Sequence, residues 1–546
     1  MTLRLTLALI AAFLLAWKLG PIRGAGLRVA QWLESRWAPV VIGLLTAIIV
    51  TVGWGSLRQI PIIHDEASYL FQAKLFASGH WTAPSPPVPE FFEQWHVLVV
   101  PHYASKYPPG HALLLVPGIW LGLPGLIPVL LGAATAALVF SIARRLTNGI
   151  VAFWTWGCWI TSFIVLWMLG SYFSQTTSAF CWMLGWYALL RWRDGEERWL
   201  FVVAVVVAWL GLTRPLTALA YAIPVGVYVL RTTAQRRRWR TLGSAIALGL
   251  GMLVLLPVWS VKTIGTARTT PYALYSKVYF PWDAPGFGLD STPPLRAITP
   301  DMAIVAASNA APHRAYQPSA LPRNLVARTR YVLAIMWGPP RIIVTALGLI
   351  GLFAMTAELL FGLASMATLL VVYLWFNHDP TWPVYYFEIE PVLAFLAALG
   401  LWRVMSWRWR TLRVRATREP STPLLAGTSL LMMLAFGAYA WTVAAAEHSD
   451  STNAQAYQSN FLRAVARLPK EKTIVFVRYA SWHNPHLSLI HNDPDLEHAL
   501  RWFVYDHGAE NVRLTRAAPD RKAYVFDEQR STIKPFVPAG DTLAGR

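Results

Sequence analysis

Apolar runs long enough to cross a membrane recur through the first 446 residues, and this repetition restricts the chain to a helical membrane fold. A spanning helix needs about 20 predominantly apolar residues, and 55% of the chain is hydrophobic, with a mean hydropathy of +0.41. We predict an all-α polytopic membrane protein with about twelve transmembrane helices. The runs lie near residues 3–17, 38–55, 112–140, 149–170, 174–190, 199–213, 215–230, 241–261, 342–357, 359–376, 384–402 and 423–446.

Basic residues cluster in short loops between these runs, and they orient the chain in its membrane. The formal net charge is +19, and nearly all of this excess lies before residue 446. By the positive-inside rule the basic loops are cytoplasmic, so the segments 56–111, 262–341 and 446–546 are predicted to lie outside. The charge therefore sets topology and does not indicate nucleic-acid binding. We expect a multi-pass protein of the plasma (inner) membrane with its active site on the extracytoplasmic, or periplasmic, face. The orientation of the run 3–17 stays open.

The change in composition near residue 446 predicts two domains. We expect a transmembrane domain over 1–445 and a small extracytoplasmic α/β domain over 446–546. In the second of these, strand-like residues 473–479 and 523–528 flank a helix-like stretch at 494–508.

The two long outside segments differ in their patterns. In 56–111, apolar residues at spacings of three and four predict an interfacial helix over 66–79, and a new helix begins after Pro108. The segment 262–341 has no long periodic pattern and is expected to be largely irregular.

An acidic pair, Asp65 and Glu66, lies just beyond the apolar run that ends at Gly55. Acids at the start of a helix often cap it and complement its dipole. The functional alternative is a carboxylate that deprotonates or orients an acceptor hydroxyl or amine. Because capping does not exclude catalysis, both residues are candidate catalytic groups.

Two basic residues are candidates for binding a phosphate. Lys106, with His102 and Tyr107 beside it, comes just before the helix near Pro108, where an ammonium group and helix-terminal N–H groups can hold an anion. The alternative is a lysine that snorkels to the lipid headgroups. Arg214 is the sole charge in a turn predicted to be outside, where the positive-inside rule disfavours it. Binding of a phosphate group explains an arginine in this outside turn better than the absence of any function does.

Other candidate substrate-binding residues lie at the outer end of a late apolar run and in the second outside segment. Aromatic residues at a membrane interface are ordinary, but acids among them are less so. The candidates are Tyr385, Tyr386, Glu388, Glu390 and Asp283.

The residues that usually bind metals form no compact motif. Four histidines of the tail occur at irregular spacings among Asn, Pro and Asp, which favours a solvated loop over a closed zinc site. Both cysteines lie inside apolar runs, so we expect neither disulfides nor thiolate-bound metals. The histidines are His483, His486, His491 and His498, and the cysteines are Cys158 and Cys181.

Taken together, several motifs resemble those of the GT-C fold glycosyltransferases, and among these the protein O-mannosyltransferase and lipid A aminoarabinose transferase superfamily. The resemblance covers the order of elements over residues 38–402, and most of the matching motifs lie within residues 60–118. It rests on the acidic pair after the first main crossing, the helix KLFASGHW, a lysine before two prolines, the Arg214–Pro215 turn, and aromatics with acids before a late span.

The resemblance implies a GT-C fold and roles for individual residues. Asp65 becomes the leading base, Glu66 the second acid and Lys106 the contact to the donor phosphate. Tyr107 stands between Lys106 and Pro108, which departs from the family's Lys-Pro-Pro motif. The implied partners are a polyprenyl-phosphate-linked sugar donor, membrane lipids, and a glycan, lipid or protein acceptor.

We therefore predict an inverting glycosyltransferase of the cell envelope. Its chemistry requires no metal, although a divalent cation that bridges Asp65 and phosphate is an open alternative. The rival functions are a transporter or flippase of lipid-linked saccharide, disfavoured by charge-free spans, and a non-catalytic scaffold. We expect the C-terminal domain to contact acceptor through Trp482, His483 and Asn484.

Overall fold

A computed structural model of the chain describes residues 22–55, 57, 60–283, 285–338, 341–354, 356–406 and 423–538. The apolar run at 3–17 lies outside this described part. The chain separates into two compact units. The first, here called the helical unit, contains Met1–Leu57, Leu126–Leu253 and Pro318–Ser449, and the second, the mixed unit, contains Arg58–Gly125, Val254–Gln317 and Asp450–Arg546.

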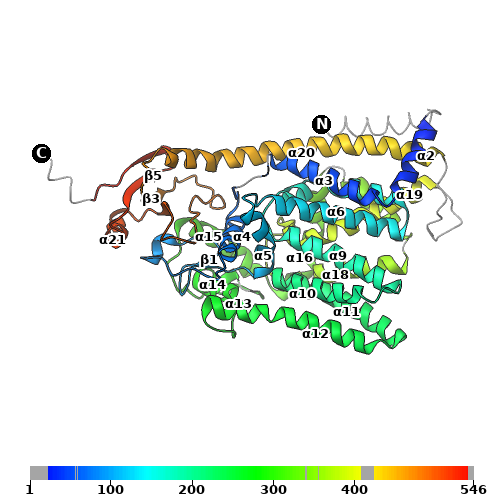
Figure 1. Cartoon of the computed structure of the whole chain (residues 1–546), viewed down its shortest axis with the longest axis horizontal. Helices are drawn as coiled ribbons and strands as arrows, with labels where there is room; N and C mark the ends of the chain where they lie inside the picture. Colours follow the sequence, from blue (N-terminus) through cyan, green and yellow to red (C-terminus); the bar gives the residue numbers. More distant parts are fainter. Residues whose placement is uncertain are drawn as a thin grey trace. The chain divides into compact units, whose positions relative to one another are not determined.

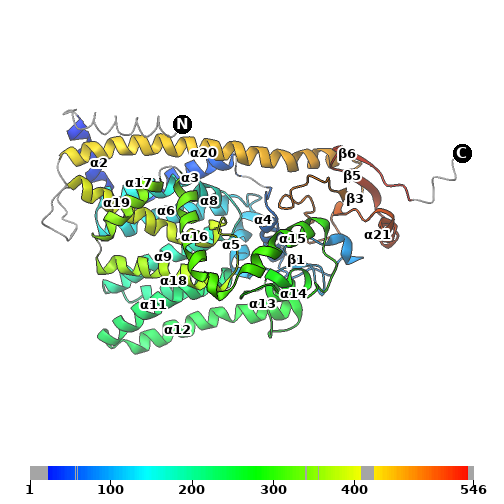
Figure 2. The same cartoon turned by 180° about the vertical axis from the view of Figure 1, so that it is seen from behind.

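Apolar helices build the helical unit. Helix α3 packs against α6, α9 packs against α6 and α10, and α10 packs against α11 and α12; Figures 1 and 2 show α9, α10, α11 and α12 running beside one another. The helices are α2 (Ile22–Leu33), α3 (Ala38–Trp54), α6 (Leu126–Leu146), α7 (Gly149–Ile160), α8 (Phe163–Leu169), α9 (Gln175–Arg193), α10 (Trp199–Thr213), α11 (Pro215–Arg236), α12 (Trp239–Leu253), α16 (Leu321–Trp337), α17 (Arg341–Leu352), α18 (Ala357–Val372), α19 (Glu390–Ser406), and the first part of α20 (Pro423–Ala466).

Close packing in this unit depends on glycine where α17 meets α19. A side chain at Gly351 would collide with the backbone carbonyl of Leu396, and one at Gly400 would collide with that of Leu347. Small residues let apolar helices approach closely, which is a common basis of helix association in membranes.

Four helices in the described part of the chain are long and apolar enough to span a membrane, or up to seven spans if each of three bent helix pairs counts as one. The protein is therefore a multi-pass membrane protein. The number of twelve spans stays a prediction. The four helices are Leu126–Leu146, Pro215–Arg236, Trp239–Ile264 and Pro383–Val404.

The mixed unit combines short helices with two sheets. The predicted helices after residue 66 and after Pro108 are confirmed as α4 and α5. The expectation of an irregular second segment is wrong, because α14 and α15 form there and pack with Trp95 and Leu98 in a core of their own. The elements are α4 (His64–Ala77), α5 (Pro109–Trp120), α13 (Leu255–Ile264), α14 (Pro271–Tyr279), α15 (Pro300–Ala315), α21 (Asn511–Ala517), β1 (Val97–Leu98), β2 (Ala104–Ser105), β3 (Thr473–Arg478), β4 (Arg501–Tyr505), β5 (Lys522–Asp527) and β6 (Thr532–Pro535).

A four-stranded sheet organises the C-terminal part, in the order β4-β3-β5-β6. Strands β3, β4 and β5 are parallel, and β6 is antiparallel to β5. Strands β3 and β5 confirm the two predicted strands. The helix expected at 494–508 is wrong, because residues 501–505 pair with β3 and bury Trp502 and Val504. Strand pairing outweighed a local pattern that also fits a helix.

Both faces of this sheet are covered by segments distant in sequence. Ile474 and Phe476 of β3 pack with Phe71 and Phe91 from the first outside segment. Their neighbours Val475 and Val477 point to the other face, where the last turns of α20 cover them. Figure 2 shows α21 beside β3 and β5. The C-terminal residues thus share their core with residues 71–103, and the predicted boundary at 445/446 falls inside α20.

Candidate active site

The first turn of α4 positions the acidic pair. The N-cap is Ile63 and makes no side-chain capping bond, so capping is not the role of Asp65. Glu66 is fully buried, and its Oε2 accepts a hydrogen bond of 2.7 Å from the backbone N–H of Ile62. Glu66 is therefore a buried structural residue at the start of α4. Asp65 is the more accessible acid of the pair, with a side chain 25% exposed.

Three side chains hold the Asp65 carboxylate. The Tyr107 hydroxyl donates a hydrogen bond of 2.5 Å to Oδ1. His64 Nδ1 lies 2.9 Å from Oδ2, and His96 Nε2 lies 3.5 Å from Oδ1. Burial acts to raise the pKa of Asp65, but His96 and His64 outweigh it and hold the pKa well below its usual range. Asp65 is therefore ionised at neutral pH.

The β1–β2 hairpin brings His96 beside Lys106. The His96 carbonyl accepts hydrogen bonds from the Lys106 N–H, 2.9 Å, and from the Ser68 hydroxyl, 3.0 Å. The His96 N–H donates 2.8 Å to the Tyr275 hydroxyl. These bonds hold His96 at a φ of 63°, which L residues seldom adopt. Burial, aided by the charge of Lys106, lowers the pKa of His96 to about 3, so its ring is neutral at physiological pH.

Lys106 lies in a cage of tyrosines. Its ammonium nitrogen is 4.4 Å from the Tyr272 ring centre, 4.7 Å from Tyr275 and 5.3 Å from Tyr107. The residue is only 2% exposed, so the snorkelling alternative is wrong, because a snorkelling ammonium group reaches water. Burial lowers the pKa of Lys106, which the carboxylates of Asp283 and Asp65 partly offset.

Two other predicted residues also lie in the mixed unit. Burial raises the pKa of Asp283 to about 6, although Lys106 acts to lower it. Asp283 is thus electrostatically coupled to the predicted phosphate contact. His102 Nδ1 is 2.9 Å from the carbonyl oxygen of Thr263 in α13, where it ties the hairpin to that helix.

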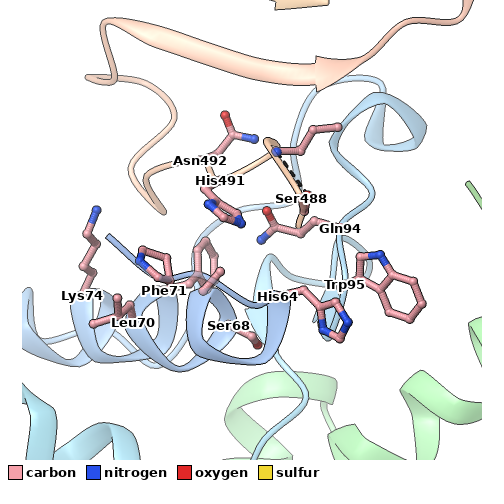
Figure 3. A pocket seen from close by; sticks show the side chains of 13 residues that line it. His64, Ser68, Leu70, Phe71, Lys74, Gln94, Trp95, Ser488, His491 and Asn492 are labelled. Atoms are coloured by element: carbon pink, nitrogen blue, oxygen red, sulfur yellow. Dashed lines mark hydrogen bonds between the residues drawn. The ribbon is translucent and has the colours of Figure 1, made fainter. Parts of the chain in front are cut away.

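A cavity of about 110 Å³ lies beside the Asp65 cluster. Helix α4 lines one side, and Ser488, His491 and Asn492 line the opposite side (Figure 3). Its volume suffices for a few water molecules or a small substituent. His491 Nε2 is buried and has no hydrogen-bond partner among the described residues, so this nitrogen is available to a bound group.

The tail histidines do not form the solvated loop that we expected. His483 is buried, its Nδ1 is 3.0 Å from Glu528 Oε1, and its ring stacks on Tyr479. His491 is half-buried in the wall of the cavity, and its Nε2 atom is buried. Only His498 is largely open, with a side chain 78% exposed. Of the three residues expected to contact acceptor, Trp482 is 61% exposed, and none lines the cavity.

The predicted residues of the helical unit form a cluster around Arg214. Its guanidinium donates 3.1 Å to the Tyr373 hydroxyl and 3.3 Å to Ser174, and it lies 3.9 Å from Glu388. The ring of Tyr385 is 5.9 Å from the guanidinium carbon. Arg214 therefore lies beside two other predicted substrate-binding residues, Tyr385 and Glu388. Its positive charge faces the buried carboxylate of Glu388.

Two residues of the same predicted group are buried elsewhere in this unit. The Tyr386 hydroxyl lies 2.9 Å from His378 Nε2 and accepts 3.2 Å from Arg328. Glu390 is fully buried, and neither oxygen has a hydrogen-bond partner among the described residues. Neither side chain is exposed in this structure.

One group of residues has the chemistry of a cation site. Ligand atoms of His64, Asp65 and His96 all lie within 4.8 Å of one another. Two imidazoles and a carboxylate are a common donor set of catalytic metal sites. Both ring nitrogens of His96 are buried without a hydrogen-bond partner among the described residues. The residues present therefore fit a divalent cation.

Sequence reasoning missed the histidines and tyrosines around the candidate residues. His64 directly precedes Asp65, and a histidine beside a candidate base is a signal that could have been used. Tyr272 and Tyr275 are three residues apart on α14 and so share one face. His96 and His486 carry no such signal, because only the hairpin and the C-terminal fold bring them to Asp65.

The apolar helices and the small C-terminal sheet are those of a membrane protein of the GT-C fold. No family model matches the sequence, and no curated protein matches it. The chain is similar to the crystal structure of ArnT from Cupriavidus metallidurans bound to undecaprenyl phosphate, with 15% identity, 90% of this chain and 93% of that chain covered, and a TM-score of 0.50. This likeness establishes the fold.

Two further solved structures are similar at lower scores. The apo state of the same ArnT has 15% identity, covers 88% of this chain and 92% of its own, and has a TM-score of 0.46. The oligosaccharyltransferase AglB from Archaeoglobus fulgidus, in complex with an inhibitory peptide and a dolichol-phosphate, has 13% identity, covers 91% and 70%, and has a TM-score of 0.40.

Proposed function

We propose that the protein is an inverting glycosyltransferase that moves a sugar from a polyprenyl-phosphate donor to an acceptor outside the plasma membrane. The acceptor oxygen or nitrogen bonds to the anomeric carbon, the bond from that carbon to the phosphate oxygen breaks, and its electron pair leaves with the lipid phosphate. Asp65 orients the acceptor and receives its proton. A divalent cation at the Asp65 cluster would supply further positive charge for the phosphate.

The observation that carries this proposal is the Asp65 site itself. An ionised, partly exposed carboxylate is held by Tyr107, His64 and His96, and a buried lysine lies next to them. Among the described residues, the ammonium group of Lys106 forms no hydrogen bond or ion pair, and it contacts the faces of three tyrosine rings. A cation kept out of ion pairs is suited to an incoming anion.

To test this, the purified full-length protein is reconstituted in lipid vesicles and incubated with a labelled polyprenyl-phosphate sugar. An extract of envelope glycans, lipids and proteins is added as the source of acceptor. Release of lipid phosphate together with labelled acceptor is the expected result. Donor that crosses the bilayer intact would indicate a flippase, and donor that neither reacts nor crosses would indicate a scaffold. Either of these outcomes overturns the proposal.

The Arg214→Gln variant is expected to bind polyprenyl phosphate roughly 10- to 150-fold more weakly, because a charge-assisted contact contributes about 1.5–3 kcal/mol. The same change leaves buried Glu388 without its cation, which lowers stability. The Arg214→Gln/Glu388→Gln double variant removes that unpaired charge. Titration of a short-chain lipid phosphate into both variants separates the effects, and wild-type affinity in the double variant would make Arg214 a purely structural partner of Glu388.

We further propose that the cavity beside Asp65 receives part of the acceptor. The His491→Ala variant is expected to raise the KM for acceptor by about tenfold, a loss of about 1.4 kcal/mol that corresponds to one hydrogen bond. Hydrolysis of donor by water should stay within about twofold. His498→Ala, an exposed histidine of the same region, is the matched control. Equal KM values for both variants would remove the cavity from acceptor binding.

A further inference from the structure

We propose that His486, from the C-terminal part of the chain, orients His64 in a transition-metal site of the zinc class formed by His64, Asp65 and His96. The proposal deepens the function proposed for Asp65, but it is tested by metal binding alone. The absence of metal binding would overturn this proposal without contradicting sugar transfer. The absence of sugar transfer would likewise not contradict metal binding.

The ligand atoms lie near the spacing that such a site requires. His64 Nδ1 and Asp65 Oδ2 are 2.9 Å apart, and His96 Nε2 and Asp65 Oδ1 are 3.5 Å apart. In a tetrahedral site with bonds of about 2.0–2.1 Å, adjacent ligand atoms are about 3.3–3.4 Å apart. One ligand atom from each of the three residues lies within 4.8 Å of the others, so shifts of about 1 Å would bring these atoms around one ion.

His96 is held in place by its backbone, whereas its ring nitrogens make no hydrogen bond to the described residues. Its backbone is fixed by hydrogen bonds to Tyr275, Ser68 and Lys106. The residue is 9% exposed, and neither Nδ1 nor Nε2 has a hydrogen-bond partner among the described residues. Buried polar atoms without partners are costly in proteins, and a metal ion would use one of these nitrogens.

His486 determines which nitrogen of His64 can bind a metal. The two rings meet at 3.0 Å, between His64 Nε2 and His486 Nδ1. When His64 donates its Nε2 proton to His486, the lone pair on Nδ1 faces the Asp65 carboxylate, and a cation between them removes the repulsion. Metal-bound histidines commonly donate their second N–H in this way. Trp95 fixes the same ring by stacking on it at 4.5 Å.

The loop that carries His486 is itself fixed. The His486 N–H donates 3.0 Å to Oδ1 of Asn484, and Ser488 Oγ accepts from the N–H of Ile490 at 3.2 Å. His486 is therefore presented to His64 by an ordered turn. In the opposite tautomer, His486 donates to His64 and His64 donates to Asp65, which would form a proton relay without a metal. The titration below distinguishes these two states.

The donor set also defines the class of metal. Imidazole suits zinc, cobalt, nickel and copper, whereas magnesium and calcium prefer carboxylate, carbonyl and water oxygens. The neighbouring charges are Lys106, which opposes a cation, and Asp283, which favours one. We therefore expect a site that binds zinc and cobalt and discriminates against magnesium.

The test titrates Co²⁺ into chelator-treated full-length protein and records the visible absorption of the bound ion. One Co²⁺ per chain is expected, displaced by Zn²⁺ and unaffected by excess Mg²⁺. His96→Ala should abolish this binding, and His486→Ala should weaken it by 10–100-fold. His486→Gln should restore part of the affinity, because its amide oxygen can accept the His64 N–H. The matched control, His498→Ala, should bind as the wild type does.

Thermal unfolding of each variant without metal shows whether it is folded. The proposal is overturned if the wild type binds no Co²⁺, which is the result expected of the proton relay. It is also overturned if folded His486→Ala binds Co²⁺ as tightly as the wild type. Equal losses in His486→Ala and in the control His498→Ala would contradict it as well.

Discussion

The Asp65→Asn variant is expected to lose sugar transfer by about a hundredfold or more in kcat, while its affinity for donor changes little. The amide has the size of the carboxylate, and its oxygen can still accept a hydrogen bond from the Tyr107 hydroxyl. It carries no negative charge and cannot take up the acceptor proton, and proton transfer of this kind contributes about 10²–10⁴-fold. Steady-state transfer and equilibrium binding of donor, measured on the same membrane-inserted preparation, check both halves of this expectation.

Glu66→Gln is the matched control for this experiment. The glutamine carbonyl can still accept the Ile62 N–H, so the start of α4 should be preserved and kcat should stay within about tenfold. If Glu66→Gln is the inactive variant and Asp65→Asn the active one, the two roles must be exchanged. Because Asp65→Asn removes a proton acceptor and a metal ligand at once, the Co²⁺ titration is needed to separate these two contributions.

The Lys106→Met variant is expected to bind polyprenyl phosphate about 10- to 150-fold more weakly than the wild type. Methionine keeps an unbranched apolar stem against Tyr272 and Tyr275 but removes the charge, and charge-assisted hydrogen bonds contribute about 1.5–3 kcal/mol. Transfer should fall in parallel, because the same charge would stabilise the departing phosphate. Titration of a short-chain lipid phosphate measures the first effect, and single-turnover transfer measures the second.

Lys74→Met is the control for the loss of a lysine. Lys74 lies on α4 in the same unit, 46% exposed at its side chain and paired with Asp493 at 3.1 Å. Its removal is expected to change phosphate affinity by less than about threefold, since exposed ion pairs contribute roughly 0.2–1 kcal/mol. If Lys106→Met and Lys74→Met bind lipid phosphate equally well, Lys106 has no role in donor binding.

The shared core of the mixed unit changes how the C-terminal part can be studied. Removal of all residues after Ser449 would take away β3 and β4 and expose the faces of Phe71 and Phe91 that pack on them. Loss of activity in such a truncated protein would then reflect lost packing as much as lost contacts to substrate. Single substitutions at His486 and His491 avoid this difficulty.

Features that depend on neighbouring residues were predicted well from the sequence. Apolar runs indicated a helical membrane fold, and spacings of three and four indicated the helix that the structure has as α4. Strand-like apolar stretches indicated β3 and β5. The 494–508 stretch failed because an apolar segment of that length fits either helix or strand, and only pairing with β3 decided it.

The sequence by itself determined the membrane class of the protein, several of its elements and the residue types near Asp65, because these follow from composition and local periodicity. Only the tertiary structure decided that His96 and His486 meet His64 and Asp65, and that tyrosines of α14 enclose Lys106. His64 and His486 are 422 positions apart in the chain. Contacts over such separations depend on the path of the whole chain, which leaves no periodic signal in the local sequence.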